Sequence, residues 1–261
     1  MLLVIDIGNT NIVSGLFDGE TLVHQWRISS DTNRSSDEYG LIYTQLFEVN
    51  GVEFDEVEDI MIASVVPSLA HTIPSMCERY LKKRPLIVGV GTKTGINIKY
   101  DNPKEVGADR IVNAVAGFER YGGPLILVDI GTAISFDVMD EGGNYLGGAI
   151  APGIGISSDA LFMRTAKLPK VELTEPSKAI GKNTVQSMQS GIVFGYIGLI
   201  DGIIERIIRE LDRPASEVKV VGTGGFIRLL ANQSKYIQET DAMITLDGLR
   251  ILYEKNKREP R

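Results

Sequence analysis

Two copies of one short pattern constrain the fold of this chain more than any other feature of its sequence. The first copy, VIDIGNTN, runs from Val4 to Asn11, and the second, LVDIGTAIS, runs from Leu127 to Ser135. In each copy an apolar run typical of a buried strand ends in Asp-Ile-Gly, and small hydrogen-bonding residues follow. Because the pattern recurs in matching contexts, we interpret it as a duplicated structural device.

The segments around the two copies predict two α/β halves of the same plan. Each half opens with a strand, a glycine turn and two further strands, and then alternates helices with strands. Strands are expected at 2–7, 12–17, 21–29, 60–66, 86–90, 124–129, 133–139, 145–150 and 218–221, and helices at 36–50, 68–83, 108–121, 184–211 and 240–256, with one short helix within 152–182. We therefore expect two domains, residues 1–122 and 123–261, packed around a central cleft.

Composition excludes several classes of function. The 27 Lys and Arg residues are outnumbered by 34 Asp and Glu, and the net charge of −7 disfavours a nucleic-acid partner. Cys77 is the single cysteine, and His24 and His71 are the only histidines, so an internal disulfide and a Cys-rich zinc site are excluded. The first apolar run is broken by Asp6, and no apolar segment fits a membrane span. A cytoplasmic location is the default expectation.

The glycine turns are candidate phosphate loops. A glycine after a buried strand lets an anion approach main-chain N–H groups closely, and the side chains of Asn9, Thr10 and Thr132 add donors. Asp6 and Asp129 would repel phosphate unless a cation lies between them, and Mg²⁺ is commonly held by carboxylates together with phosphate oxygens. The alternative is that each aspartate only caps its turn; the repetition favours nucleotide binding.

Three other glycine patterns carry less weight. Gly222-Thr223-Gly224-Gly225 is either an ordinary strand-to-helix connection or a surface on which a flat ring lies. Gly181-Lys182-Asn183-Thr184 resembles the end of a Walker A loop, but Pro176 stands where the first glycine is required. Gly89-Val90-Gly91 lacks the third glycine of a dinucleotide fingerprint.

A polar stretch, DNPKEVGADR, precedes the helix expected from Ala108. An acidic residue near a helix N-terminus is common for helix-dipole reasons alone, and that would account for Asp109. Beside a phosphate site, however, Asp109 can accept a proton from an attacking hydroxyl, and Arg110 can pair with an acidic substrate or the transferred phosphoryl group.

These residues together resemble the type III pantothenate kinases, a family of the actin and sugar kinase superfamily. The specific match combines Asp6 to Thr10, Asp101-Asn102-Pro103, Gly107 to Arg110 and Asp129 to Ala133, in the family's order and over essentially the whole chain. The resemblance implies two duplicated actin-like (ribonuclease H-like) α/β domains with mixed sheets. It also implies ATP-dependent phosphorylation of pantothenate to 4'-phosphopantothenate, the first step of coenzyme A biosynthesis.

The resemblance also assigns roles to individual residues. It implies that Asp109 is the general base and that Asp129 binds a monovalent cation, potassium or ammonium, in addition to the Mg²⁺ that accompanies ATP. The first phosphate loop would comprise Asp6, Ile7, Gly8, Asn9, Thr10, Asn11, Ile12 and Val13, and the second would include Thr132. The pantothenate contacts would be Tyr100, Gly107, Ala108, Asp109, Arg110 and Thr184, with Thr184 reaching the site of the partner subunit in a homodimer.

The long helix expected at 184–211 is apolar on more than one face. A helix in the centre of a large core explains this, and so does a helix that meets its symmetry mate, so we expect a C2 dimer. Two other functions stay open: a nucleotide-binding switch of the same superfamily, and a sugar or acetate kinase on the same scaffold. Asp109 favours a kinase over a switch, and the short chain and the stretch 101–110 speak against the other kinases.

Overall fold

The computed structural model describes residues 1–257, and the contacts within it define two compact units. Unit 1 comprises Met1–Ile96, Asp101–Ala116 and the described residues from Met243 onward, and unit 2 comprises Asn97–Tyr100 and Gly117–Ala242. Both units are therefore discontinuous in sequence, whereas the expected domains, 1–122 and 123–261, are continuous. The expected boundary stays a prediction.

A five-stranded mixed sheet carries unit 1. Its strands are β1 (Leu2–Ile7), β2 (Asn11–Asp18), β3 (Thr21–Ser29), β4 (Asp59–Ser64) and β5 (Leu86–Ile87), in the order β3-β2-β1-β4-β5. β1, β2 and β3 form an antiparallel meander, and β4 and β5 add to it in parallel. The carboxyl ends of the parallel strands β1 and β4 therefore lie at the same edge of this sheet.

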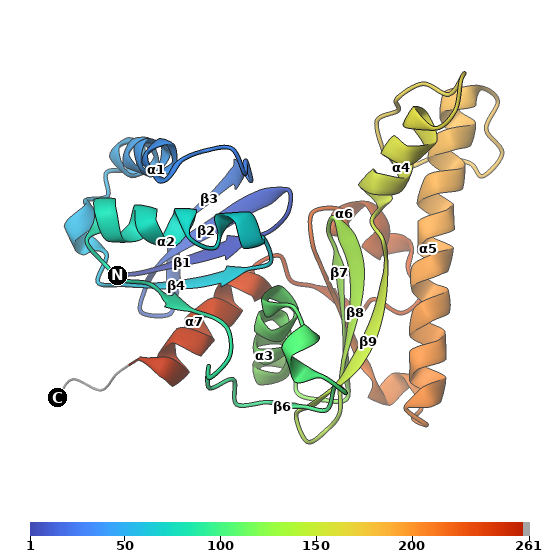
Figure 1. The fold of residues 1–261 in the computed structure, drawn as a ribbon. Helices are drawn as coiled ribbons and strands as arrows, with labels where there is room; N and C mark the ends of the chain where they lie inside the picture. Colours follow the sequence, from blue (N-terminus) through green and yellow to red (C-terminus); the bar gives the residue numbers. More distant parts are fainter. Residues whose placement is uncertain (258–261) are drawn as a thin grey trace. The chain divides into compact units, whose positions relative to one another are not determined.

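Alternating residues of β1 bury both faces of this sheet. Leu3 and Ile5 belong to a core under α1 and α2, whereas Leu2 and Val4 face a second core that includes residues of α3 and α7. Figure 1 shows α1 and α2 on one side of the sheet and α7 on the other. The helices are α1 (Ser36–Asn50), α2 (Thr72–Met76), α3 (Ala108–Tyr121), which continues into unit 2 from Gly117, and α7 (Ile244–Asn256).

A six-stranded mixed sheet carries unit 2. Its strands are β6 (Asn97–Ile98), β7 (Leu125–Ile130), β8 (Ala133–Met139), β9 (Asn144–Pro152), β10 (Lys219–Thr223) and β11 (Glu239–Thr240). They lie in the order β11-β10-β7-β8-β9-β6, with β7, β8 and β9 as an antiparallel meander and the remaining pairs parallel. Apart from β6 at the edge, this is the strand order of unit 1.

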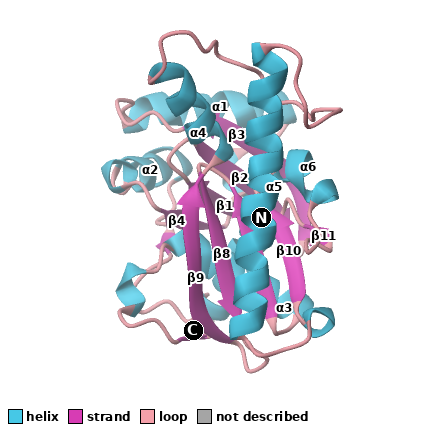
Figure 2. Ribbon diagram, turned by 90° about the vertical axis from the view of Figure 1, so that its right-hand side faces the viewer, coloured by secondary structure: helices cyan, strands magenta, loops and turns pink. Residues whose placement is uncertain are grey.

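Three helices belong wholly to unit 2: α4 (Ile154–Met163), α5 (Thr184–Glu210) and α6 (Ile227–Leu230). The long helix α5 crosses one face of the sheet (Figure 2), and its residues Val193, Ile200 and Ile204 are buried in one cluster with residues of β7 and β8. The apolar character of this helix is thus explained in part by core packing. None of the helices within residues 1–257 is both long and apolar enough to cross a bilayer.

The mixed α/β class expected from the sequence is confirmed, and three local expectations are wrong. The strand expected at 86–90 is only two residues long, and the helix expected at 68–83 is divided into a 3₁₀ turn, α2 and a π-helical turn. The helix expected from residue 240 begins at Ile244, because Glu239 and Thr240 pair with β10 as β11. β6 was not expected, and it is held by pairing with the start of β9.

Candidate active site

The first glycine turn joins β1 to β2 in unit 1. Ile7 pairs with Ile12 across the hairpin, so the turn has four residues, and the Gly8 N–H donates to the Asn11 carbonyl at 3.0 Å. A Cβ on Gly8 would lie 3.2 Å from that carbonyl oxygen, which explains why glycine stands there. Asn9 and Thr10 are exposed at the tip. The turn therefore presents its main chain and two polar side chains to solvent.

The second turn joins β7 to β8 in unit 2 and is one residue shorter. Ile130 pairs with Ile134, and the Gly131 N–H donates to the Ala133 carbonyl at 3.0 Å. Thr132 and Ala133 are exposed. The two copies of the sequence pattern thus form the same hairpin in the two units, but with different turn lengths.

Each turn is held from behind by the residue that follows the third strand of its meander. After β3, the Ser30 N–H donates to the Thr10 carbonyl at 3.0 Å, and after β9 the Gly153 N–H donates to the Thr132 carbonyl at 3.1 Å. The Ser30 hydroxyl also donates to the Gly8 carbonyl at 2.5 Å. Sequence reasoning missed both residues; the signal for them is their equivalent place after the duplicated meanders.

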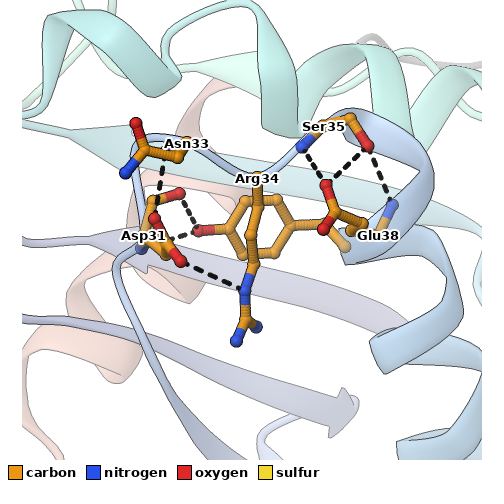
Figure 3. Close-up of polar contacts among 6 residues, drawn as sticks. Asp31, Asn33, Arg34, Ser35 and Glu38 are labelled. Atoms are coloured by element: carbon orange, nitrogen blue, oxygen red, sulfur yellow. Dashed lines mark hydrogen bonds and ion pairs between the residues drawn. The ribbon is translucent and has the colours of Figure 1, made fainter.

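The segment that follows Ser30 is fixed by local hydrogen bonds (Figure 3). The Tyr39 hydroxyl donates to the Asp31 carbonyl at 2.9 Å, and Arg34 pairs with the Asp31 carboxylate. Ser35 and Glu38 form a capping box at the start of α1, and hydrogen bonds from Ser35 lower the pKa of Glu38. This rigid connection gives the first turn a fixed support.

Asp129 lies at the end of β7, against the glycine turn that follows β10. Gly224 has φ +95°, and a Cβ on it would lie 2.5 Å from Asp129 Oδ1 and 2.6 Å from the main chain of Ile130. The Phe226 N–H also donates to the Ile130 carbonyl at 3.2 Å. The late glycine turn, uncertain from sequence, therefore packs directly on the strand that carries the second phosphate-loop candidate.

Asp109 lies in the first turn of α3, in unit 1. Its Oδ1 accepts a hydrogen bond from the Arg110 N–H at 2.8 Å, and the same oxygen lies 2.5 Å from where a Cβ on Gly107 would be. Burial raises the pKa of Asp109, and the Arg110 N–H and guanidinium partly oppose that rise. A carboxylate with a raised pKa is a better proton acceptor than an ordinary exposed aspartate.

Val65 connects Gly107, two residues before Asp109, to the first turn. The Val65 N–H donates to the Ile7 carbonyl at 3.1 Å, directly before Gly8. A Cβ on Gly107 would lie 3.7 Å from Val65 Cγ1, in ordinary contact. Within unit 1, the structure therefore brings the predicted base and the predicted first phosphate loop to the same edge of the sheet.

Tyr100 lies in unit 2, two residues after β6. β6 pairs with β9, and the Lys99 N–H donates to the Tyr145 carbonyl at 2.8 Å. The Tyr100 ring lies against the Tyr145 ring, with centroids 6.4 Å apart, and 3.3 Å from where a Cβ on Gly147 would be. Tyr100 is therefore anchored near the beginning of β9.

Thr184 is exposed at the N-terminus of α5 and lines an open pocket of about 740 Å³ in unit 2. Asn183 caps the helix by accepting from the Gln186 N–H at 2.9 Å, and Leu161 of α4 forms another wall of the pocket. Because α4 follows the end of β9 while Tyr100 lies near its beginning, roughly 20 Å of strand separates the two regions. The structure does not bring Thr184 and Tyr100 of one chain together.

Each candidate cation site is built on a single carboxylate, Asp6 or Asp129. Across residues 1–257, no three His, Cys, Asp or Glu side chains come together as a metal-binding group. Asp129 lies against the main chain of Gly224 and Ile130, and carboxylate oxygens suit hard cations such as K⁺ and Mg²⁺. The donor chemistry at Asp6 and Asp129 therefore fits the cations that the sequence predicts.

Comparison with known proteins gives a consistent result. The model of the family described as type III pantothenate kinase matches residues 2–206. The type III pantothenate kinase from Finegoldia magna is 56% identical to this chain, and the match covers 99% of this chain and 99% of that protein. The type III pantothenate kinase from Brevibacillus brevis is 52% identical, and the match covers 98% of this chain and 100% of that protein.

A solved structure adds evidence on the fold alone. The activator of the 2-hydroxyisocaproyl-CoA dehydratase from Clostridium difficile has a TM-score of 0.52 and 12% identity, with 100% of this chain and 99% of that chain covered. It shares the duplicated actin-like architecture expected from the two turns. On the family match and the two full-length relatives, this chain belongs to the type III pantothenate kinase family.

Proposed function

We propose that this protein transfers the γ-phosphoryl group of ATP to pantothenate, giving 4'-phosphopantothenate for coenzyme A biosynthesis, with Asp109 as the general base. The family to which the chain belongs supports the activity and both substrates. The observation that carries the assignment of the base is the position of Asp109: its carboxylate lies beside Gly107, which Val65 connects to the first glycine turn, and burial raises its pKa.

The glycine turns bind the phosphates of ATP. The main-chain N–H groups of the first turn, together with Asn9 and Thr10, supply donors, and Thr132 supplies a further hydroxyl from the second turn. Main-chain donors suit a chain with a net charge of −7, since they attract phosphate without added cationic side chains. Mg²⁺, when bound with ATP near Asp6, supplies neutralisation of the phosphate charge.

Asp109 accepts the proton of the pantothenate hydroxyl as the new O–P bond forms. Phosphoryl transfer has a loose transition state, so the base needs to act only late and positioning matters most. Arg110 is nine-tenths buried beside Asp109 and holds the carboxylate of pantothenate or the transferred group. Tyr100, Gly107 and Ala108 complete the pantothenate contacts proposed for one chain.

Asp129 binds a monovalent cation, K⁺ or NH₄⁺. The proposal is supported by its place at the end of β7, beside the second turn, and by the close approach of Gly224, which leaves main-chain groups against the carboxylate. A monovalent ion there would offset the charge of Asp129 beside bound phosphate. Activity should therefore depend on K⁺ or NH₄⁺ and decline when Na⁺ replaces them.

The protein acts as a homodimer, in which Thr184 completes the pantothenate site of the partner subunit. The separation of Thr184 and Tyr100 along β9 supports this, because one pantothenate molecule is too short to contact both in the same chain. Apolar side chains near Thr184 are exposed on α4 and before α5, including Phe162, Met163 and Ile180. We further propose a cytoplasmic location, where ATP and pantothenate are both available.

One assay tests the activity against its alternatives. The protein is incubated with ATP, Mg²⁺ and K⁺, and ADP release is compared with pantothenate, a hexose, acetate or no acceptor. ADP release that requires pantothenate supports the proposal. Release without any acceptor would instead identify a nucleotide-driven switch, and release with the hexose or acetate would identify another kinase of this fold.

A further inference from the structure

Asp137 is a buried carboxylate to which phosphoryl transfer, as proposed above, gives no role. It lies on β8 in unit 2, and only 1% of its surface is exposed. Burying a carboxylate is costly unless its oxygens are hydrogen-bonded. Its partners therefore indicate what this residue does.

Both carboxylate oxygens of Asp137 accept hydrogen bonds from neighbouring hydroxyl groups. The Tyr145 hydroxyl donates to Oδ1 at 2.7 Å, and the Ser135 hydroxyl donates to Oδ2 at 3.0 Å. Tyr145 is itself fully buried, at 0% exposure. The hydrogen bond to Oδ1 holds the Tyr145 hydroxyl at Asp137 and so fixes the Tyr145 ring in one orientation.

Tyr145 is in turn one of the two surfaces that support Tyr100. The two rings are 6.4 Å apart between centroids and inclined at 49°, and the Tyr145 carbonyl accepts the Lys99 N–H directly before Tyr100. The other surface is Gly147, whose φ of +117° and missing side chain let the Tyr100 ring approach the strand. The Tyr100 ring thus rests on a side chain whose orientation Asp137 determines.

The same carboxylate lies close in the sheet to the second phosphate turn. Ser135, the other partner of Asp137, is paired across β7 and β8 with Asp129, the proposed cation ligand. Because side chains at i and i+2 of a strand share one face, Ser135 and Asp137 lie on the same face of β8. Two hydrogen bonds therefore join Ser135, Asp137 and Tyr145 in a row that begins at the register position of Asp129 and ends in the ring contact with Tyr100.

We propose that Asp137 and Tyr145 are positioning residues for pantothenate, which act by holding the ring of Tyr100 in its subsite. The inference rests on the proposed function, because it takes Tyr100 as a pantothenate contact. It assigns a specific role to two buried residues that the proposed function does not otherwise use. A merely structural role would lower stability and leave the kinetics of the folded enzyme unchanged.

The first test is Tyr145→Phe, which keeps the ring and removes only the hydroxyl. The KM for pantothenate should rise about tenfold, while the KM for ATP and kcat stay within about twofold of wild type. The matched control is Tyr43→Phe in unit 1, which also removes a fully buried tyrosine hydroxyl, one hydrogen-bonded to Ser14 at 2.5 Å. The control should lower the Tm and change neither KM.

A second pair of variants tests the carboxylate itself. Asp137→Asn keeps a carbonyl oxygen that can accept from Tyr145, whereas Asp137→Ala removes the acceptor. The KM for pantothenate should therefore rise more in the alanine variant than in the asparagine variant. If either variant fails to fold, Tyr145→Phe still decides the question.

Tyr100→Ala separates failure of this inference from failure of the proposed function. A wild-type protein that does not phosphorylate pantothenate would overturn the function and, with it, the inference. An active wild type in which Tyr100→Ala raises the KM for pantothenate, while Tyr145→Phe leaves it unchanged or raises both KM values equally, would overturn the inference alone. A selective rise in both variants supports it.

Discussion

The proposed chemistry depends most directly on the carboxyl group of Asp109. It lies beside Gly107 in unit 1, and it is positioned by the Arg110 N–H. Asp109→Asn keeps the shape and the oxygen acceptor and removes the basic carboxylate. We expect kcat to fall by about 10²–10⁴-fold, with a modest effect on the KM for ATP, measured by ADP release at saturating substrates. A variant with wild-type turnover would remove Asp109 from the mechanism.

The same substitution should have an effect of opposite sign on stability. Burial raises the pKa of Asp109 in the folded protein above its unfolded value, so ionising it opposes folding. Its favourable contribution is complete below the unfolded pKa, about pH 4, and is lost as the pH rises through the raised folded pKa. Asp109→Asn cannot ionise, so its free energy of unfolding should exceed that of wild type at pH 8, and the gap should narrow as the pH falls through the raised folded pKa to the unfolded pKa.

Urea unfolding of both proteins at a series of pH values measures this difference. Asp37→Asn is a suitable control, because the Asp37 side chain is half-exposed and paired with Arg79 at the surface. A constant gap between wild type and Asp109→Asn from pH 8 down to about pH 3, below the unfolded pKa, would contradict a raised pKa. The stability lost by wild type at high pH would be the structural cost of keeping a base at this position.

At the scale of elements, the second turn depends on a main-chain contact that only glycine permits. A Cβ on Gly153 would lie 2.1 Å from the Thr132 carbonyl oxygen and 2.6 Å from that of Gly131, both main-chain atoms. Gly153→Ala must therefore displace the turn or α4. We expect a loss of about 1–3 kcal/mol in the free energy of unfolding and a rise in the KM for ATP.

Gly155→Ala provides the comparison for this prediction. Gly155 lies two residues further on, and a Cβ there would meet only Phe226 side-chain atoms at 3.6 Å, which is ordinary contact. Its stability should match or slightly exceed that of wild type, because alanine favours a helix. Equal KM values for ATP in the two variants would mean that Gly153 does not position the second turn.

The elements that could be predicted from sequence are those whose signal is local. The strands β1, β2 and β3 carry apolar runs and glycine turns of their own, and α1 carries its capping box within four residues. β6 and β11 are two residues long and exist only through pairing with β9 and β10, which are distant in sequence. No local pattern predicts such strands, because their stabilising hydrogen bonds come from elsewhere in the chain.

The residues of the candidate site also fall into those that local sequence predicts and those that it does not. The glycine turns and Asp109 could be predicted, because their residue types and spacing carry the signal. Ser30 and Gly153 could not, since their role consists of single hydrogen bonds across a folded meander. The burial that raises the pKa of Asp109 is likewise set by contacts made in the folded chain.

At the scale of the whole molecule, the duplication extends beyond the two turns. Both sheets have the same order of five strands, and the helix after the fifth strand is α3 in the first repeat and α7 in the second. Yet α7 belongs to unit 1, and α3 is divided between the units at Ala116 and Gly117. Each repeat thus ends in a helix that belongs wholly or partly to the unit of the other repeat.

The proposed dimer makes a prediction that a monomeric enzyme cannot satisfy. If Thr184 completes the partner's site, a heterodimer of an Asp109→Asn chain and a Thr184→Ala chain contains one site with both defects and one with neither. Two inactive variants should therefore regain activity when they are co-expressed with different tags and purified through both. If each site used its own Thr184, every site would carry one defect and no activity would return.

If the two variant chains pair at random, the expected recovery of activity can be calculated. Half of the dimers would be mixed and half of their sites intact, so an unfractionated mixture should recover about a quarter of wild-type activity. A control mixture of Asp109→Asn with Asp109→Asn carrying the second tag should recover none. The double variant Phe162→Glu, Met163→Glu changes two exposed apolar residues of α4. It should sediment as a monomer and abolish the recovery of activity. Val49→Glu, at an exposed position of α1 in unit 1, should do neither. Recovery by chains that sediment as monomers would contradict a site shared between subunits.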